Sequence, residues 1–332
     1  MMNIEIFSKW LRRQGHDVIH TESSYWFNAG PRVYQAFPFG WIIQPSEAEL
    51  RELMIKHNIL ALRYSTPLDY TQGVASYHVV LQKPYDLDCI GRKSRNNIKQ
   101  GLSACQVEKI SFGRLAKEGW KLQDDTIERQ KRTDCMGQSE WEKICLSAED
   151  LPGFTAWGAI VDGKLAASII TARIGDTWYV PYAQCLQEYM CQRVNHALFF
   201  TASCNMLADE GIKEIFFSLH SLDAPASVNG FKFRMGHTAR PVRQRVVLHP
   251  ILKPFVNQSS YKLVNLLHLR NPDSNFLSKT EGMLRFYILG KKPLYEQEWP
   301  DCLDKYKQSF SHPPEPAVLE QAKSTRVLTN AD

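Results

Sequence analysis

The 332-residue sequence contains no long apolar segment. Its longest mostly apolar stretch covers 12 residues, from Ala197 to Ala208, and is interrupted by Thr201, Ser203 and Asn205. A helix that crosses a membrane needs about 20 apolar residues, so we expect no transmembrane helix. The first 15 residues mix basic with apolar side chains, which does not match the apolar region of a secretory signal. We therefore expect a cytoplasmic protein.

The cysteines lack the spacing of a metal site or a redox pair. No two of the eight cysteines are separated by two residues, which excludes zinc-ribbon, iron–sulfur and thioredoxin-type arrangements. Without a secretory signal, reduced thiols are the simplest interpretation. We expect no metal cofactor.

Several common signatures of function are missing too. The sequence has no G-x-x-x-x-G-K-[ST] loop and no G-x-G-x-x-G turn after a strand, which argues against nucleotide hydrolysis and dinucleotide binding. It also lacks G-x-S-x-G and H-E-x-x-H, which argues against common serine hydrolases and zinc proteases. The net charge of +5, from 40 Lys plus Arg and 35 Asp plus Glu, is too small to indicate general nucleic-acid binding. We expect no duplex nucleic acid among the partners.

What remains is the composition of an ordinary folded protein, with 44% hydrophobic and 23% charged residues. At roughly 150 residues per domain the length suggests about two domains. Changes of pattern along the chain divide it into an N-terminal lobe with a helical segment over 1–150 and a C-terminal lobe over 151–250. A helical extension over 251–311 and a flexible tail over 312–332 follow, because the tail has three prolines within five residues and little hydrophobic pattern.

The clearest pattern lies between residues 155 and 248. Two turns, Asp162-Gly163 and Gly175-Asp176, separate three apolar runs, and Asp-Gly between such runs is a strong signal for a β-hairpin. A helix over Gln192–Glu210, a strand over Ile215–Leu219, a short helix and a strand over Arg240–Leu248 come next. The order β-β-β-α-β-α-β predicts an α+β fold with a mixed, mainly antiparallel sheet.

The first half contains one helix of functional interest. The apolar spacing predicts it over Leu87–Leu102, after strands at Ile59–Tyr64 and Tyr77–Gln82. Three of its cations, Arg92, Arg95 and Lys99, fall within a narrow arc, and no acidic residue lies between Arg92 and Lys99. Such a face is either a solvated surface or a binding surface for phosphate groups, and the spacing leaves both interpretations open.

Five segments, in order, resemble the Fem-type and cellulose-biosynthesis-type acyltransferases, a branch of the GNAT superfamily. The run YHVVLQKPYDLDCIGRKSRNNIKQGLSAC, from Tyr77 to Cys105, resembles the family's strand, spacer and K-x-R-x-x-I-x-x helix. TAWGAIVDGKLAASIITARIGDTWYVPYA resembles its central hairpin. The helix that follows, then KEIFFSLH and NGFKFRMG, resemble its later helix, strand and F-K signature. The similarity covers about residues 25–250.

This resemblance implies tandem GNAT-like lobes with a groove between them and acyl transfer to an amine or a hydroxyl. It implies acyl-CoA as the co-substrate, with aminoacyl-tRNA as the alternative of the Fem-type branch. GNAT enzymes hold the CoA pyrophosphate on a glycine-containing turn before the central helix. Here that turn, Gln184 to Arg193, reads QCLQEYMCQR and has no glycine, so the donor stays open between the two.

The same resemblance suggests the site residues. Lys232 of NGFKFRMG matches a lysine near the acyl carbonyl, where an ammonium group stabilises the oxyanion of the tetrahedral intermediate. The other interpretation is a salt bridge or a donor phosphate contact. His220 is a candidate general base because an imidazole titrates near neutral pH.

Further residues are candidates for binding substrate or donor. Tyr179 and Tyr182 on the hairpin are candidates for lining the groove, and Phe231 and Arg234 flank Lys232. A basic stretch free of acidic residues is expected to join the cations of the earlier helix in a funnel for a phosphorylated ligand; it consists of Lys232, Arg234, Arg240, Arg243 and Arg245.

Three functions therefore remain. We expect first an acyltransferase that uses acyl-CoA and acts on a precursor of the cell envelope or of a polysaccharide. The second is aminoacyl transfer from tRNA, and the third is a GNAT-like binding module without catalysis. The expected acceptor is a small molecule or a glycan precursor, with peripheral association with membrane-bound biosynthetic machinery as a further expectation.

Overall fold

The computed structural model of the chain describes residues 4–129, 136–220, 230–272 and 274–310. The tail expected over 312–332 and the short helix expected over Pro225–Asn229 lie outside these residues.

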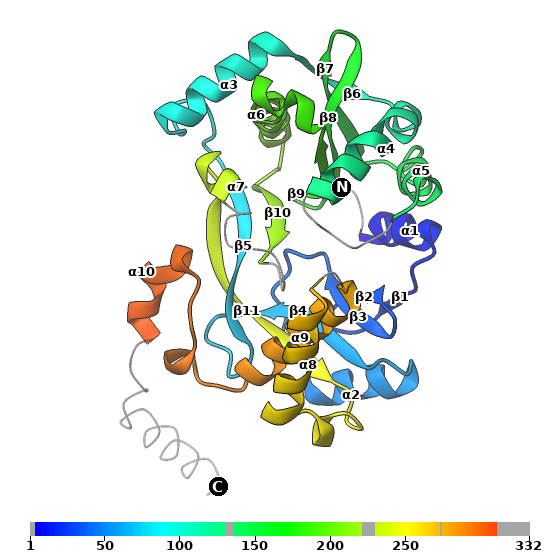
Figure 1. The fold of residues 1–332 in the computed structure, drawn as a ribbon, viewed down its shortest axis with the longest axis vertical. Helices are drawn as coiled ribbons and strands as arrows, with labels where there is room; N and C mark the ends of the chain where they lie inside the picture. Colours follow the sequence, from blue (N-terminus) through cyan, green and yellow to red (C-terminus); the bar gives the residue numbers. More distant parts are fainter. Residues whose placement is uncertain (1–3, 130–135, 221–229, 273, 311–332) are drawn as a thin grey trace, which may run out of the picture.

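Within the described residues, eleven strands join edge to edge in one sheet (Figure 1). Their order is β1-β2-β3-β4-β11-β5-β10-β9-β8-β7-β6. The strands are β1 (Val18–His20), β2 (Tyr25–Gly30), β3 (Val33–Phe37), β4 (Ala61–Thr66), β5 (Val74–Gln82), β6 (Gln106–Ile110), β7 (Phe154–Val161), β8 (Lys164–Ile174), β9 (Thr177–Cys185), β10 (Glu214–Leu219) and β11 (Thr238–Leu248).

The sheet consists of two lobes that repeat one α+β unit. Strands β1 to β5 and β11 form the lower lobe of Figure 1, and β6 to β10 form the upper lobe. Only β3–β4 and β9–β10 pair in parallel; every other pairing in this sheet is antiparallel. Each parallel pair needs a crossover helix, which is α2 (Glu47–Lys56) below and α6 (Val194–Ala208) above. The predicted α+β class, with two lobes and a mixed, mainly antiparallel sheet, is confirmed.

The predicted hairpin in the upper lobe is present. Asp162 and Gly163, with φ of 49° and 79°, connect β7 to β8. Positive φ at both central positions is the geometry of the two-residue turn that matches the twist of the strands. The next turn uses Gly175, with φ of 61°, to connect β8 to β9.

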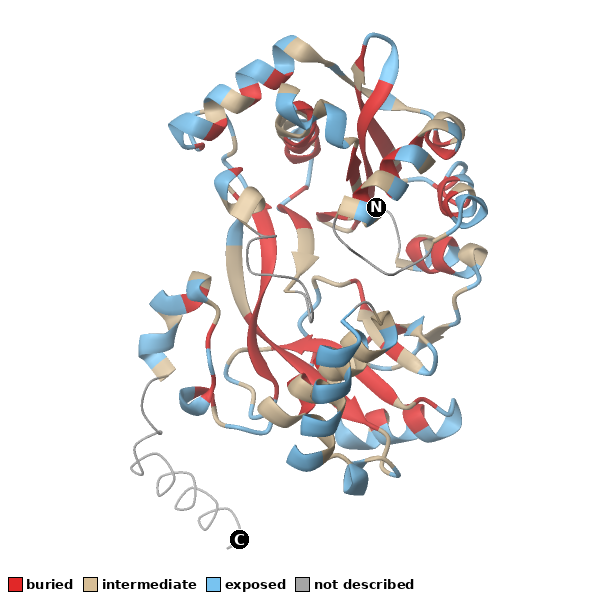
Figure 2. Cartoon of the chain, viewed as in Figure 1, coloured by how far each residue is buried: buried red, intermediate tan, exposed pale blue. Residues whose placement is uncertain are grey.

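Helices cover both faces of the upper lobe (Figure 2). On one face α1 (Ile4–Gln14), α4 (Phe112–Arg129) and α5 (Gln138–Leu146) bury Trp10, Leu115 and Trp141 against β8 and β9. On the other face α3 (Arg92–Ala104) packs against α6, and Ile98 and Leu198 are fully buried between these helices and the sheet.

Strand pairing crosses the division that we predicted at residue 150. β6 pairs with β7 in the upper lobe, whereas β11 lies between β4 and β5 in the lower lobe. Thus α3, α4, α5 and β6 lie in the upper lobe although they precede residue 150. Whether the chain divides near residue 150 into units that fold independently stays a prediction.

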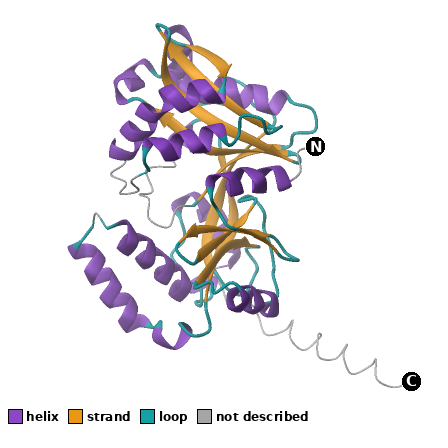
Figure 3. Cartoon of the chain, turned by 90° about the vertical axis from the view of Figure 1, so that its right-hand side faces the viewer, coloured by secondary structure: helices purple, strands orange, loops and turns teal. Residues whose placement is uncertain are grey.

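The segment after β11 is helical and covers the lower lobe. A short turn η3 (Lys253–Phe255) leads to α8 (Gln258–Arg270) and α9 (Asn275–Leu289). Asn257 caps α8 by accepting from the amides of Ser259 and Ser260, and α9 buries Phe286 and Tyr287 against the sheet. α8 packs on α9 and has no buried residue. Figure 3 shows this helical hairpin standing out at the left of the lower lobe.

The chain then runs along β5 through three short turns and α10 (Asp304–Lys307). Leu294, Trp299 and Leu303 are buried there against Tyr77 and Val79 of β5.

Candidate functional site

The sheet opens where β9 and β10 diverge. The two strands pair only over Thr177–Tyr179 and Glu214–Phe216. Beyond this point β9 continues along β8, while β10 continues along β5 with a bulge between Phe216 and Ser218. A bulge adds one residue to a strand and redirects its side chains. We treat the surroundings of this divergence as the candidate site.

Lys232 lies at the divergence, on the single helical turn α7 (Gly230–Arg234). Its Nζ donates to Ser218 Oγ at 2.8 Å and lies 4.6 Å from the ring centre of the bulged Phe217. Burial lowers the pKa of Lys232 from 10.5 to about 8, because the charged form loses hydration. The ammonium form therefore predominates at neutral pH, and it loses its proton near pH 8, within the pH range of ordinary enzyme assays.

Aromatic contacts fix α7 on both sides of Lys232. The ring of Phe231 lies 5.1 Å from that of His196 and 5.5 Å from that of Phe199, both on α6. The ring of Phe233 lies 6.0 Å from that of Tyr77 on β5. The predicted role of Phe231 in binding is not tested; its contacts show that it anchors the turn that carries the lysine.

His220 follows the last residue of β10 and is held in place by β5 and by Arg63 of β4. Its Nδ1 lies 3.2 Å from Ser76 Oγ, its ring stacks on Tyr77 at 4.6 Å, and its carbonyl accepts from Arg63 at 3.0 Å. Burial, aided by the positive charges of Arg63 and Arg285, lowers the pKa of His220 to about 4. The imidazole is thus neutral at pH 7, as a base must be, but it is a weak base.

A second histidine nearby escaped the sequence analysis. His78, on β5, is fully buried; its Nε2 lies 2.8 Å from Ser65 Oγ, and its Nδ1 has no hydrogen-bond partner among the described residues. Its ring meets the edge of Phe216 at 5.2 Å. Burial, and secondarily Arg240, lowers its pKa to about 3. The only sequence signal was a histidine inside the apolar run YHVVL.

The two tyrosines of the hairpin have different surroundings. Tyr179 is buried at the divergence, with its ring 5.3 Å from that of Phe216. The chain at Gly40 lies against both, since a Cβ there would be 2.9 Å from the Phe216 ring and 3.2 Å from the Tyr179 hydroxyl. Tyr182 instead packs edge-on against Trp10 and Trp141, at 6.3 and 5.7 Å. Only Tyr179 lies next to the other site residues.

The cations of α3 are not directed at this site. α3 turns Ser94, Ile98 and Gly101 toward the protein interior, and at about 100° per residue Arg92 and Lys99 lie on the opposite side, where both are exposed. Arg95 forms an ion pair with Asp88 at 3.5 Å and donates to the carbonyl of Ile90. This placement fits the solvated-face interpretation, and binding of an anion by these residues stays a prediction.

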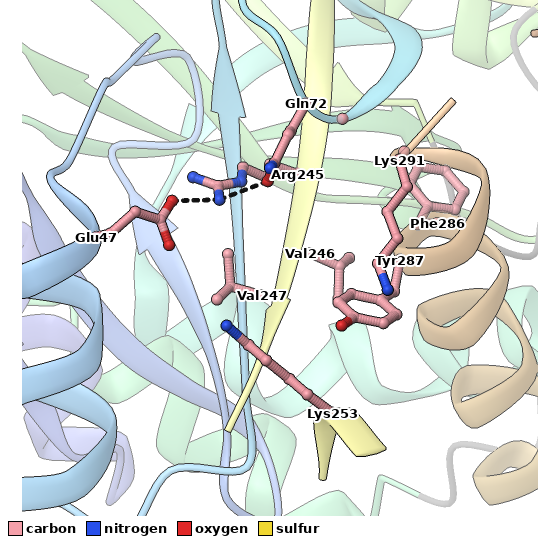
Figure 4. A pocket seen from close by; sticks show the side chains of 11 residues that line it. Glu47, Gln72, Arg245, Val246, Val247, Lys253, Phe286, Tyr287 and Lys291 are labelled. Atoms are coloured by element: carbon pink, nitrogen blue, oxygen red, sulfur yellow. Dashed lines mark hydrogen bonds and ion pairs between the residues drawn. The ribbon is translucent and has the colours of Figure 1, made fainter. Parts of the chain in front are cut away.

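The arginines of β11 do not form one cationic surface with the cations of α3. Arg240 pairs with Glu214, and Arg243 donates to the carbonyl of Tyr70. Arg245 lines a separate cavity of about 150 Å³ in the lower lobe, together with Lys253 and Lys291. Figure 4 shows its guanidinium between Glu47 and Gln72. The prediction that these three arginines belong to a funnel for a phosphorylated ligand is therefore wrong, because their guanidinium groups bind other groups of the protein.

A different cationic cluster forms at the start of α6. Arg193, with φ of 63°, is its N-cap, and the turn QCLQEYMCQR runs into it as a 3-10 helix over Gln187–Gln192. Burial, then the charges of Arg193 and Arg234, lowers the pKa of His196 to about 4. An exposed Arg234 near a helix N-terminus provides positive charge where backbone N–H groups attract anions.

A glycine on α3, Gly101, lies against the start of α6. A Cβ on Gly101 would lie 2.4 Å from the Arg193 carbonyl oxygen and 3.0 Å from the Ala197 Cβ. Only glycine allows α3 to approach the first turn of α6 this closely. Asn97, one turn earlier on α3, contacts His196 at 3.3 Å.

The described residues include no group of three His, Cys, Asp or Glu side chains placed to hold a metal ion.

Comparison of the sequence with protein-family models and with curated proteins gives no match. Solved structures do match. FemX superposes with a TM-score of 0.51 at 10% identity, covering 75% of this chain and 92% of FemX. The C-terminal domain of a putative lysylphosphatidylglycerol synthetase from Agrobacterium fabrum superposes with a TM-score of 0.50 at 9% identity, covering 73% and 86%. The chain shares its fold with FemX and with this synthetase domain.

Proposed function

We propose that this chain is an acyltransferase whose reaction takes place where β9 and β10 diverge. The observation that carries the proposal is the half-buried cation Lys232, held by Ser218 and Phe217 at the bulge of β10. In acyl transfer an amine or hydroxyl attacks the acyl carbonyl, negative charge develops on the carbonyl oxygen, and the thiol or tRNA hydroxyl leaves with a proton. A preorganised ammonium group stabilises that charge most in the transition state.

The pKa of Lys232 supports this role. An ammonium whose pKa is about 8 is cationic at neutral pH and is also acidic enough to protonate a departing thiolate, whose conjugate thiol has a pKa of about 8.5. His220 and His78 supply neutral imidazoles on the same sheet, and we retain His220 as the proposed proton acceptor.

We propose acyl-CoA as the donor, and an amine or hydroxyl of an envelope or polysaccharide precursor as the acceptor, in the cytoplasm. The start of α6 would hold the phosphates, with Arg193 and Arg234 as cations. The absence of a glycine from Gln184 to Arg193 favours aminoacyl-tRNA as the second candidate donor, and the fold shared with FemX is compatible with it.

Thermal-shift titrations with CoA, acetyl-CoA and aminoacyl-tRNA separate these donors. A ligand at about 100 times its Kd stabilises the folded state by about 2.7 kcal/mol. Stabilisation by CoA compounds alone supports the first candidate, and stabilisation by charged tRNA alone supports the second. If no donor stabilises the protein, the proposal fails.

Single-turnover transfer with the donor so identified tests the lysine. Lys232→Ala should lower kcat about 100-fold or more with little change in donor affinity, and Lys232→Arg should rescue only part of it because a planar guanidinium places its charge differently. Lys164→Ala, on the exposed hairpin turn, is the matched control. An increase of KM at unchanged kcat would make Lys232 a phosphate contact, and donor binding without transfer would make the chain a binding module.

A further inference from the structure

The helical hairpin of α8 and α9 exposes an unusual amount of apolar surface. Half of the strongly exposed large hydrophobic side chains among the described residues lie between 251 and 276. They are Ile251, Phe255, Leu263, Leu266, Leu267, Leu269 and Phe276, with 39% to 75% of each exposed. We call these seven residues the hairpin patch. Seven exposed large apolar side chains within one short segment of the chain indicate an interaction site.

Four leucines of the patch share one face of α8. At about 100° per residue, Leu263, Leu266, Leu267 and Leu269 fall within an arc of roughly 160°. The opposite face is directed to α9, where the Tyr261 hydroxyl donates to Glu281 at 3.0 Å. The outward leucines are therefore not the packing face of a helix within this fold.

Positive charge accompanies the leucines. Lys262 and Arg270 lie within the same arc of α8 and are exposed. Glu281, the one acidic residue of the two helices, accepts from Tyr261 and from Arg285 at 3.1 Å and so is neutralised inside the hairpin. Exposed lysines also stand at its base, at positions 253, 291 and 292.

The charge of the whole chain is concentrated here. Residues 249–292 contain seven Lys and Arg and two Asp and Glu, a net charge of +5, which equals the net charge of the entire chain. The rest of the sequence is neutral overall. The apolar face and the positive potential thus coincide on one element.

We propose that the hairpin patch binds the surface of an anionic lipid bilayer, with α8 lying in the plane of the interface. An apolar face bordered by Lys and Arg is what an interfacial helix needs, since the bilayer takes the leucines and anionic headgroups neutralise the cations. A second copy of the chain fits less well, because a two-fold interface would place this positive face against itself. Nucleic acid supplies negative charge but no apolar layer to cover the leucines. This inference does not rest on the proposed acyltransferase activity.

Co-sedimentation of the full chain with vesicles tests it. We expect binding to vesicles of phosphatidylcholine containing one third phosphatidylglycerol, and little binding to pure phosphatidylcholine. Raising the salt concentration from about 0.1 M to about 1 M shortens the Debye length from about 10 Å to about 3 Å and should weaken binding. The variant Lys262→Gln/Arg270→Gln should lose about fivefold in affinity per cation.

The apolar part is tested by Leu263→Ser/Leu266→Ser/Leu267→Ser, which should abolish detectable binding without lowering Tm, because the three side chains are exposed. Ile55→Ser/Leu146→Ser is the matched control, since both side chains are exposed elsewhere, at 56% and 48%.

Three results would overturn the inference: no binding of the folded chain to anionic vesicles, equal loss of binding in the control, or a dimer in solution that the triple leucine variant converts to monomer. The last result would assign the patch to contact between copies.

Discussion

Gly101→Ala perturbs the contact on which the start of α6 depends. The added Cβ would lie 2.4 Å from the Arg193 carbonyl oxygen, so α3 or α6 must move by at least 0.6 Å to reach the 3.0 Å below which real Cβ contacts are essentially never seen. The atoms involved are backbone and cannot rotate away. Overpacking of this kind costs about 1–3 kcal/mol.

Part of that cost is offset because alanine favours the helix over glycine by about 1 kcal/mol. We therefore expect a net destabilisation of up to about 2 kcal/mol. For a chain of this length the entropy of unfolding is about 0.7 kcal/mol/K, so Tm should fall by up to about 3 °C. The binding of CoA or charged tRNA should weaken as well, since the first turn of α6 is displaced.

Gly113→Ala is the control, because Gly113 is also helical but its nearest neighbour would be 3.5 Å from the new Cβ. It should leave Tm unchanged or slightly raised. Differential scanning fluorimetry of the two variants side by side is the assay. If Gly101→Ala melts at or above the wild-type temperature, the two helices do not need this glycine, and our account of the α6 start is wrong.

Three further predictions concern titration and the hairpin. If Lys232 acts as a cation, kcat should fall as pH rises through about 8, and a rate that instead rises there would identify a neutral amine acting as base. His78 has a folded-state pKa of about 3, below its ordinary value of 6.5, so the unfolded state binds more protons in this window and the free energy of unfolding should decrease as pH falls below 6.5 toward 3. His78→Gln should flatten this dependence in chemical denaturation at several pH values, and an unchanged slope would contradict the burial. Gly163→Ala places a side chain at φ of 79° and should cost about 1–2 kcal/mol, whereas Lys164→Ala next to it should change Tm little.

Local features followed directly from short stretches of sequence. The Asp162-Gly163 turn formed because few other pairs adopt positive φ twice, and this depends on no distant contact. Ser46 is the N-cap of α2 and accepts from the amide of Glu49 three residues later, which is the first half of a capping box. The carboxylate of Glu49, however, accepts from Ser23 at 2.7 Å instead of completing the box. Glu49 thus binds Ser23, which is distant in sequence.

The candidate site was only partly accessible from the sequence. The F-K signature located Lys232, because the residues around it resemble a known pattern. Neither Ser218 nor the bulge that brings Phe217 under its ammonium group has a sequence signal. His78 was missed because a single histidine in a strand is a common core residue, and only pairing of β5 with β10 places it beside Phe216.

What the sequence determined by itself was the order of elements from β7 to β10, because periodicity, caps and turns are set within a few residues. The strands β1, β2, β3 and β6 were not predicted. Tertiary structure decided which faces are buried. At about 100° per residue Leu102 lies near Ile98 on α3, yet Leu102 is 43% exposed whereas Ile98 is fully buried, since the approach of Gly101 to Arg193 selects the face that packs. It also placed β11 between β4 and β5, where Arg240 meets Glu214 across 26 residues of sequence. Such pairings depend on the assembly of the whole sheet, which no local sequence pattern predicts.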